Sequence, residues 1–287
     1  MEKILVLGAT GMAGHTISTY FLKKGYDVYT LSSTPIKIGK NIVLDVFDYN
    51  SLKDIVDQGN YQLIINCIGL LNETANNNPD KAIYLNAFIP HFLSSITKET
   101  KTKIIQMSTD CVFSGKKGGY LENDFKDGET IYDITKSLGE LNNSKDLTFR
   151  NSIIGPDMNE KGIGLFNWFM KQKGQIQGYT TAMWTGVTTL TLAKAMEAGY
   201  KQNLTGLYHL VNNVPISKHD LLELFNNQFK RKLIITPVEK VSLDKSLINS
   251  RRDFQFVVPS YEEMIKDMYN WIMENKELYS HYFQEDN

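Results

Sequence analysis

A tyrosine and a lysine four residues apart, Tyr132 and Lys136, are the residues of this chain best suited to acid–base chemistry. On a helix, side chains four positions apart lie on one face, so the phenol and the ammonium would be neighbours. A free phenol has a pKa of about 10 and exchanges protons poorly at neutral pH. A nearby ammonium stabilises the phenolate and moves the pKa of the tyrosine toward the working range. The pair alone is common on helix surfaces, so it predicts catalysis only in a wider context.

That context is a pair of hydroxyl groups, Ser108 and Thr109, directly after a predicted strand at residues 103–107. In an open α/β sheet, ligands bind outside the carboxyl ends of the strands. A hydroxyl at that edge can donate a hydrogen bond to the carbonyl oxygen of a substrate.

A glycine-rich loop follows the first predicted strand, with Gly8, Gly11 and Gly14 in GxxGxxG spacing. Glycine at these points permits a tight turn and lets backbone N–H groups approach a pyrophosphate, which the N-terminus of the next helix also attracts. A plain turn between a strand and a helix could carry the same glycines. Because the loop stands between a strand and a helix at the start of the chain, we interpret it as a dinucleotide-binding loop.

The end of the second predicted strand distinguishes NAD from NADP. A carboxylate there accepts hydrogen bonds from the adenosine ribose, whereas hydroxyl or basic side chains accommodate a 2′-phosphate. This strand ends at Ser32 and Ser33, with Lys37 and Lys40 following, and no carboxylate stands at its tip. The pattern favours NADP(H), although the serines could also serve only to form the turn.

The elements that would position these groups alternate between buried strands and helices. We predict strands at residues 4–7, 27–31, 41–44, 62–66, 103–107 and 147–150, and helices at 12–24, 49–57 and 79–98. This alternation predicts an α/β fold with a Rossmann-type, doubly wound parallel sheet that has helices on both faces.

The second half has a less regular pattern, with a helix expected at residues 162–174. A strand at about residues 206–212 is expected to return to the main sheet. Apolar residues on one face of the segment 261–272 predict an amphipathic C-terminal helix. We expect an NAD(P)-binding domain at residues 1–155 and a smaller mixed α/β substrate-binding region at residues 156–287.

The composition of the chain argues against several classes of protein. The 287 residues carry 31 Lys+Arg and 32 Asp+Glu, a net charge of −1 that argues against non-specific binding to nucleic acid or anionic lipid. Two cysteines, Cys67 and Cys111, exclude a disulfide scaffold. No apolar run is long enough to span a membrane, no signal peptide is recognisable, and the histidines lack metal-ligand spacing. We therefore expect a cytoplasmic protein without a metal site.

The motifs together resemble the extended short-chain dehydrogenase/reductase family, and within it the dTDP-4-dehydrorhamnose reductases. Residues 108–115 (STDCVFSG) resemble the signature STDxVFxG of that group, and residues 206–211 (GLYHLV) resemble one of its strands. Residues 66–69 stand where the family has an Asn-Ala-Ala segment, and Arg150 with residues 154–156 resembles its Arg…Tyr-Gly-Pro segment. Residues 184–188 resemble a loop with a Pro-Thr-Gly motif. Matching pieces run from residue 4 to about residue 270.

The resemblance implies roles for these residues. Tyr132 would protonate the carbonyl oxygen as hydride arrives, Lys136 would lower the pKa of Tyr132 and hold the nicotinamide ribose, and Thr109, in preference to Ser108, would bind the carbonyl oxygen. The implied cofactor-binding residues are Gly8, Thr10, Gly11, Met12, Ala13, Gly14, Ser32, Ser33, Asp45, Val46, Cys67, Ile68, Gly69, Leu71, Met107, Tyr132 and Lys136. The implied substrate-binding residues are Asn86, Ser108, Thr109, Trp184, Val187 and Arg252.

The activity that the resemblance implies is NAD(P)H-dependent reduction of the 4-keto group of a dTDP- or UDP-linked 4-keto-6-deoxy sugar, in deoxysugar or surface polysaccharide biosynthesis. A homodimer is the family's frequent arrangement. Trp184 could stack on a base or sugar or lie in the core. Arg252 and its neighbour Arg251 could neutralise a diphosphate or lie free on the surface.

Two other functions remain open. The β subunit of methionine adenosyltransferase is similar to this family yet serves as a regulatory, cofactor-binding partner. Cys111 stands two residues after the catalytic hydroxyl, as does a catalytic cysteine in GDP-fucose synthase, which epimerises as well as reduces. No histidine lies between residues 92 and 208 to complete that epimerase pair, so a small buried thiol is the favoured reading.

Overall fold

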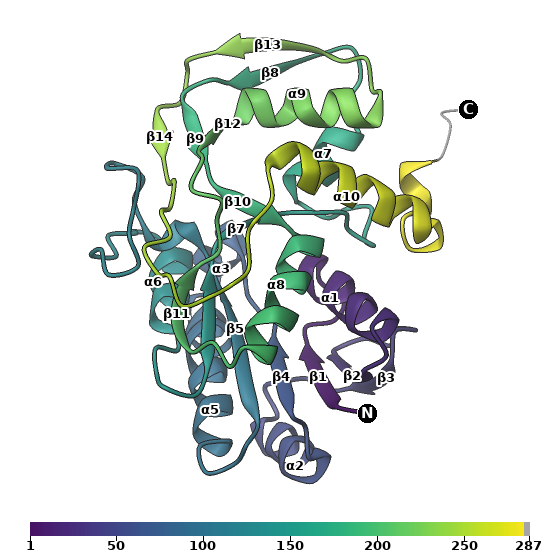
Figure 1. The fold of residues 1–287 in the computed structure, drawn as a ribbon, viewed down its shortest axis with the longest axis vertical. Helices are drawn as coiled ribbons and strands as arrows, with labels where there is room; N and C mark the ends of the chain where they lie inside the picture. The colour runs from purple at the N-terminus through teal and green to yellow at the C-terminus, as the bar shows by residue number, and fades with distance from the viewer. Residues whose placement is uncertain (284–287) are drawn as a thin grey trace.

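A seven-stranded parallel sheet forms the centre of the computed structural model, which describes residues 1–283 (Figure 1). The strands run in the order β11-β6-β5-β4-β1-β2-β3. Their bounds are β1 Lys3–Leu7, β2 Asp27–Ser32, β3 Lys40–Val43, β4 Leu63–Asn66, β5 Lys103–Ser108, β6 Leu147–Arg150 and β11 Gly206–His209. The order reverses direction at β1, which is the arrangement of a doubly wound sheet. The predicted Rossmann-type fold is therefore confirmed.

Helices cover both faces of this sheet because its strands are apolar on both sides. On one face, α1 (Met12–Lys23) and α8 (Thr189–Lys201) lie side by side, and Ile4 and Val6 of β1 point into this core (Figure 1). On the other face, α2 (Tyr49–Gly59) and α5 (Ile89–Ile96) pack against the alternate residues Leu5 and Leu7. The remaining helices of the first half are α3 (Asn72–Asn77), α4 (Pro79–Ala82) and α6 (Ile131–Leu138).

The helix predicted at residues 79–98 changes its hydrogen-bond pattern along its length. A π-helical turn, η1 (Ile83–Phe88), lies between α4 and α5 without a gap. Pro90 explains the change, since it has no N–H to donate to the carbonyl of Asn86 four residues earlier. Gly139 packs into this position so closely that a Cβ atom on it would lie 1.8 Å from the Asn86 carbonyl oxygen. The helix predicted at residues 79–98 is therefore present from Pro79 to Ile96, with a π-helical turn inside it that the prediction did not include.

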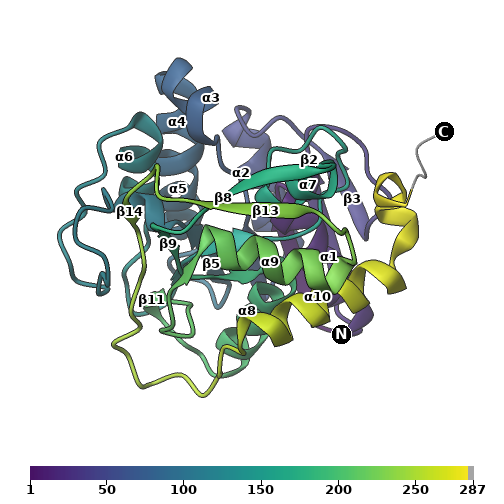
Figure 2. The ribbon, with the colours of Figure 1, turned by 90° about the horizontal axis from the view of Figure 1, so that it is seen from above.

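The C-terminal half builds a second layer over the carboxyl ends of the central strands, visible above the sheet in Figure 1 and from above in Figure 2. Its helices are α7 (Leu165–Met170), α9 (Lys218–Phe229) and α10 (Tyr261–Glu274). Its strands are β8 Gln175–Tyr179, β9 Ala182–Trp184, β10 Gly186–Thr188, β12 Ile216–Ser217, β13 Ile234–Val238 and β14 Leu243–Asp244, and β10 pairs with β7 (Ser152–Ile154). The helix predicted at residues 162–174 is shorter, since Gly164 caps its start and Gly174 adopts a positive φ of 67°.

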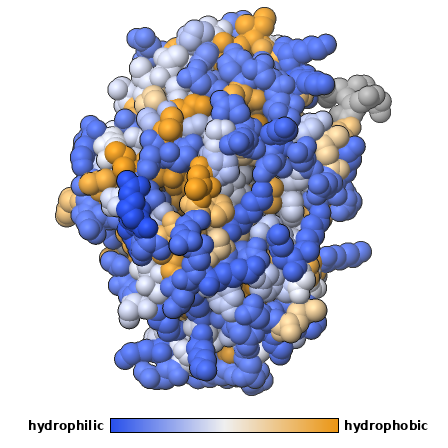
Figure 3. Space-filling model, in the orientation of Figure 1, coloured by the Kyte–Doolittle hydropathy of each residue, from blue (hydrophilic) through white to orange (hydrophobic). Residues whose placement is uncertain are grey.

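β11 carries the chain back to the edge of the central sheet, where it pairs with β6. The domain boundary after residue 155 stays a prediction. The face seen in Figure 3 is mostly hydrophilic, with apolar residues in small separate patches. Within residues 1–283, no helix is both long and apolar enough to cross a membrane.

Candidate active site

The glycine loop makes a close turn between β1 and α1. Gly8 adopts a φ of 74°, which favours glycine. A Cβ atom on Gly14 would lie 2.2 Å from the carbonyl oxygen of Gly8, so only glycine allows the helix to start this near the strand. Gly11 is the N-cap of α1 and provides no side-chain cap, which leaves the first N–H groups of the helix available to an anion.

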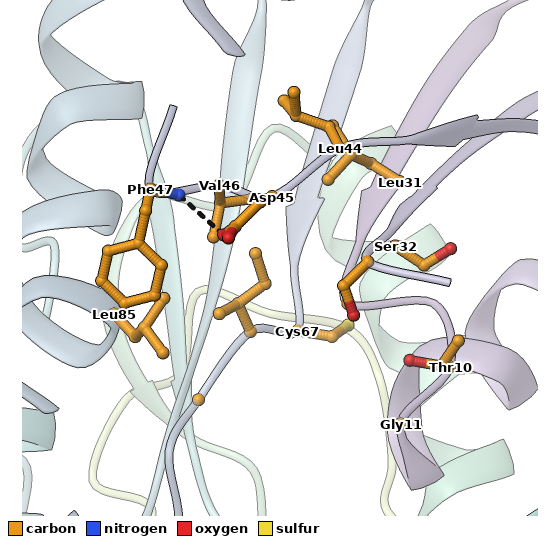
Figure 4. A pocket seen from close by; sticks show the side chains of 14 residues that line it. Thr10, Gly11, Leu31, Ser32, Leu44, Asp45, Val46, Phe47, Cys67 and Leu85 are labelled. Carbon is orange, nitrogen blue, oxygen red and sulfur yellow. Dashed lines mark hydrogen bonds between the residues drawn. The ribbon is translucent and has the colours of Figure 1, made fainter. Parts of the chain in front are cut away.

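One pocket, of about 320 Å³, runs from this loop along the ends of β2, β3 and β4 (Figure 4). Asp45 accepts a 3.1 Å hydrogen bond from the backbone N–H of Phe47, and the Phe47 ring stacks on Tyr84 with 4.7 Å between ring centres. The pocket is lined by Gly8, Thr10, Gly11, Leu31, Ser32, Ser33, Leu44, Asp45, Val46, Phe47, Cys67, Ile68, Gly69 and Leu85. Its shape and position suit the adenosine half of a dinucleotide.

The end of β2 offers fewer polar groups to a ligand than its sequence suggests. The Ser32 hydroxyl donates to the carbonyl of Thr34 and accepts from the Asn41 amide, so the turn itself uses this group. Lys40 pairs with Asp27 at 2.7 Å, near the amino end of the sheet and away from the pocket. Ser33 and Lys37 are exposed and remain as groups that could meet a 2′-phosphate.

A second pocket, of about 330 Å³, adjoins the first and shares Gly11, Cys67, Ile68 and Gly69 with it. Its other lining residues are Met12, Ala13, Leu71, Asn72, Met107, Ser108, Thr109, Asp110, Cys111, Tyr132, Lys136, Asn151, Ser152 and Ile153. The three predicted catalytic residues, Thr109, Tyr132 and Lys136, therefore face one space that continues into the groove of the glycine loop.

Tyr132 lies in the first turn of α6, which a capping box between Thr130 and Asp133 holds in place. Burial raises the pKa of the Tyr132 phenol, while a hydrogen bond with Thr109 opposes that rise. Burial is the largest influence on the pKa of Tyr132, and the role expected of Lys136 in lowering that pKa stays a prediction. The phenol is held in its protonated form, the form that a proton donor requires.

Lys136 is buried beneath Tyr132 and donates a 2.7 Å hydrogen bond to the carbonyl of Met107 at the end of β5. Burial lowers the pKa of Lys136 to about 8, and the negative charge of Glu140 opposes this shift. The bond to Met107 fixes the ammonium at the carboxyl edge of the sheet, facing the pocket.

The two hydroxyl groups after β5 have different partners. Ser108 Oγ donates a 2.6 Å hydrogen bond to Glu140, so its proton is committed to that carboxylate. Thr109 Oγ1 donates a longer, 3.1 Å hydrogen bond to the carboxylate of Asp110 and accepts from the backbone N–H of Cys111. The Thr109 hydroxyl is near enough to the Tyr132 phenol to oppose the rise of its pKa, and both residues line the same pocket. Thr109 is therefore better placed than Ser108 to bind the same substrate oxygen as the phenol.

Three residues predicted to bind substrate, Asn86, Trp184 and Val187, have other surroundings. Asn86 is fully buried, and its amide bonds both backbone groups of Leu70 and the Thr135 hydroxyl, so it shapes the loop after β4. Trp184 lies in the core against Tyr261, which is the second of the two alternatives that its sequence left open. Val187 is also in the core, beside Ile153, which does line the pocket.

Arg252 lies outside the site. Its neighbour Arg251 donates to the carbonyls of Thr205 and Leu207 at the amino end of β11, the edge of the sheet opposite to the pockets. The structure therefore does not bring Arg252 to a diphosphate on the carboxyl side. The direction of β11 in the sheet determines on which edge Arg252 lies, and the residues around Arg252 do not indicate that direction.

Sequence reasoning missed Glu140, although it continues the four-residue spacing of Tyr132 and Lys136. Arg150 holds its carboxylate through two nitrogens, each 2.7 Å away. Although burial alone would raise the pKa of Glu140, the hydrogen bonds and charge of Arg150 hold it below its ordinary value. The site thus keeps a buried carboxylate beside Lys136.

The fold and this arrangement of tyrosine, lysine and hydroxyl define an extended short-chain dehydrogenase/reductase. Within that class, the chain belongs to the family described as RmlD substrate binding domain, whose model matches residues 1–270.

Curated relatives match over shorter segments. The spore coat polysaccharide biosynthesis protein SpsK of Bacillus subtilis is 28% identical over 144 residues, covering 49% of this chain and 47% of that protein. A dTDP-4-dehydrorhamnose reductase of Streptomyces griseus is 28% identical over 138 residues, covering 47% and 43%. The chain thus matches about half the length of these relatives.

Solved structures match over almost the whole fold. The dTDP-4-dehydrorhamnose reductase of Bacillus anthracis in complex with NADP has a TM-score of 0.80 at 20% identity, covering 94% of this chain and 99% of that one. A hypothetical dTDP-4-dehydrorhamnose reductase from Sulfolobus tokodaii has a TM-score of 0.77 at 23% identity, covering 91% and 98%. At these identities the likeness establishes the fold.

Proposed function

We propose that this protein uses NADPH to reduce the 4-keto group of a nucleotide-activated 4-keto-6-deoxy sugar, dTDP- or UDP-linked, in deoxysugar or surface polysaccharide biosynthesis. The observation that carries the proposal is the convergence of Thr109, Tyr132 and Lys136 on one pocket that opens into the glycine-loop groove. The names of the relatives, which include dTDP-4-dehydrorhamnose reductases and a polysaccharide biosynthesis protein, support the substrate class.

The residues present suit a dinucleotide. Gly8 and Gly14 let α1 begin close against the strand ends, and the start of α1 can receive a pyrophosphate. Asp45 and Val46 would lie along the adenosine, and Ser33 and Lys37 favour a 2′-phosphate over a free ribose hydroxyl. When bound, the nicotinamide supplies hydride to the carbonyl carbon of the sugar.

The residues of the chain manage the oxygen of that carbonyl. Thr109 donates a hydrogen bond to it, and Tyr132 gives its phenolic proton as negative charge develops there, so that hydride and proton together make an alcohol. Lys136 stabilises the phenolate that remains. The raised pKa of Tyr132 suits the donor, because it keeps the phenol protonated until the oxygen becomes basic.

The test is the oxidation of NADPH, followed by absorbance, with dTDP- and UDP-linked 4-keto-6-deoxyhexoses. We expect turnover with one of them and a 6-deoxyhexose product. The absence of turnover with both, in protein that binds NADPH, would contradict the proposal.

Cys111 supports a second candidate, an epimerase-reductase, because its thiol lines the catalytic pocket. Burial raises the pKa of Cys111 to about 11, so the thiol is protonated at neutral pH and suits a proton donor better than a base. Reaction in D₂O separates the two functions: deuterium at C3 or C5 of the product indicates epimerisation, and its absence there indicates reduction alone.

A further inference from the structure

A buried imidazole ties the start of α1 to the C-terminal segment of the chain. His15 is fully buried, and its Nδ1 lies 2.9 Å from the carbonyl oxygen of Gly11, the N-cap of the helix. Its Nε2 lies 3.0 Å from the hydroxyl of Tyr279, in the segment after α10, and 3.3 Å from the hydroxyl of Thr16. The indole N–H of Trp271 donates a 3.0 Å hydrogen bond to the Tyr279 hydroxyl. Segments from near both ends of the sequence thus meet next to the glycine loop.

The two ends of this series of hydrogen bonds determine the direction of each bond in it. An indole N–H can only donate, so the Tyr279 oxygen accepts from Trp271 and its own proton is left for Nε2 of His15. A carbonyl oxygen can only accept, so Nδ1 of His15 carries the proton that faces Gly11. Burial lowers the pKa of His15 from 6.5 to about 4, so the ring holds a single proton at neutral pH. Tyr279 therefore keeps His15 in the tautomer that donates to the glycine loop.

The bond from His15 acts on a peptide unit at the rim of the catalytic pocket. The carbonyl of Gly11 and the N–H of Met12 belong to one planar trans peptide, in which they point in opposite directions. The backbone N–H of His15 donates to the same carbonyl at 3.1 Å, so His15 holds this oxygen from the helix side with two donors. The N–H of Met12 therefore points outward from the start of the helix, where Gly11 and Met12 line the pocket. The two donors also polarise the peptide, which makes its N–H a stronger donor to an anion.

We propose that His15 is a positioning residue for dinucleotide binding, and that Tyr279 of the C-terminal segment sets the tautomer of His15 for that role. This inference rests on the proposed function in one respect, that the glycine loop receives the pyrophosphate of NADPH. Neither His15 nor Tyr279 lines either pocket. Both act through the peptide between Gly11 and Met12, which they orient and polarise. The C-terminal segment thereby contributes to cofactor affinity from outside the site.

The experiment measures, by calorimetry, the binding to the full chain of NADPH and of adenosine 2′-monophosphate, which has no pyrophosphate. His15→Asn keeps a nitrogen as many bonds from Cβ as Nδ1, whereas His15→Gln has its amide nitrogen as far out as Nε2 and loses the donor to Gly11. We expect His15→Gln to weaken NADPH binding by about tenfold and His15→Asn by less than about threefold. Adenosine 2′-monophosphate should bind both variants as it binds the wild type. Tyr279→Phe no longer fixes the tautomer and should weaken NADPH binding by about threefold.

Tyr20→Phe is the matched control for Tyr279→Phe. Tyr20 lies on the same helix more than two turns beyond Gly11, and its buried hydroxyl donates to Glu197 of α8. Both variants lose a buried hydrogen bond, so both should have a lower melting temperature. A role in stability alone would leave NADPH affinity unchanged in both. We expect the affinity to fall only in the Tyr279→Phe protein.

Unchanged NADPH affinity in folded His15→Gln protein would overturn the inference. Equal losses in His15→Gln and His15→Asn would overturn it as well, because a donor at the Nδ1 position would then be irrelevant. A parallel loss of adenosine 2′-monophosphate binding would show that the whole groove is disturbed, which also contradicts a role confined to the peptide after Gly11. Failure of the proposed function looks different: the wild type then binds NADPH in a His15-dependent way but reduces no keto sugar. A wild type that binds no NADPH would contradict both.

Discussion

Ser108 Oγ donates a 2.6 Å hydrogen bond to the carboxylate of Glu140, which joins the end of the catalytic strand β5 to the chain just beyond helix α6. Arg150 at the end of β6 donates hydrogen bonds to the same carboxylate from two nitrogens. The contact fixes the helix that carries Tyr132 and Lys136 relative to the strand that carries Thr109. The geometry of the catalytic pocket therefore depends on a buried ion pair outside it.

Replacing Glu140 with Gln should destabilise the protein strongly, because Arg150 would keep its buried charge without a counter-ion. We expect a loss of about 3–5 kcal/mol in the free energy of unfolding. Urea denaturation measures it. Ser108→Ala is the control, since it removes one hydrogen bond and leaves the ion pair, and should cost about 1 kcal/mol. Equal losses in the two variants would show that the ion pair is not what holds the two elements.

Gly14→Ala should destabilise the protein although alanine is normally the better helix former. The exchange of glycine for alanine inside a helix ordinarily gains about 1 kcal/mol. Here the new Cβ would lie 2.2 Å from the Gly8 carbonyl oxygen, so the loop must shift and NADPH binding should weaken with it. Gly11→Ala makes only an ordinary 3.4 Å contact and serves as the control for stability. Thermal melting with and without NADPH reports both effects, and a higher melting temperature for Gly14→Ala would refute the close approach.

The activity should fall as pH rises through about 8, because Lys136 loses its proton there and the phenolate of Tyr132 loses its support. The sign is set by the shift: burial lowers the pKa of Lys136, so the charged form is present below pH 8 and disappears above it. Lys136→Arg keeps the positive charge to much higher pH. In the residual activity of that variant, the decline of kcat/KM should move to higher pH. A decline at the same pH in both proteins would assign it to another group.

Stability should fall in acid partly because of His15, which lies buried at the start of α1. Its Nδ1–H donates to the Gly11 carbonyl and its Nε2 accepts from the Tyr279 hydroxyl, so the ring is neutral when folded. Burial lowers the pKa of His15 from 6.5 to about 4. The unfolded chain binds the extra proton between these values, so stability is lost as pH falls from 6.5 toward 4, by at most about 3 kcal/mol. His15→Gln should flatten this slope in urea titrations, and an unchanged slope in that variant would assign the loss of stability in acid to other groups.

The sequence allowed the central fold and the catalytic motif to be predicted because both are local. Alternating apolar strands and helices specify a doubly wound sheet, and the carboxyl ends of β1, β4 and β5 then meet at one edge. Tyr132, Lys136 and Thr109 share a pocket because each stands at or near that edge.

The remaining features depend on contacts between distant segments. Tryptophan is a residue type that stacks well on a base or sugar, but Trp184 is buried, and its burial depends on Tyr261 of α10. Arg252 lies on the wrong edge because of the direction of β11. The π-helical turn at Asn86 could have been expected from Pro90. The close packing of Gly139 against the Asn86 carbonyl could not, because it joins two segments far apart in the sequence.

The most direct measurement is pre-steady-state oxidation of NADPH by Tyr132→Phe with the keto sugar nucleotide that the wild type accepts. Phenylalanine preserves the buried ring and removes the hydroxyl group that carries the donated proton. We predict that NADPH and sugar nucleotide still bind and that the rate of hydride transfer at saturation falls by about 10²- to 10⁴-fold. A Tyr132→Phe protein that transfers hydride at the wild-type rate would contradict the assignment of Tyr132 as the proton donor, and with it the account of this site.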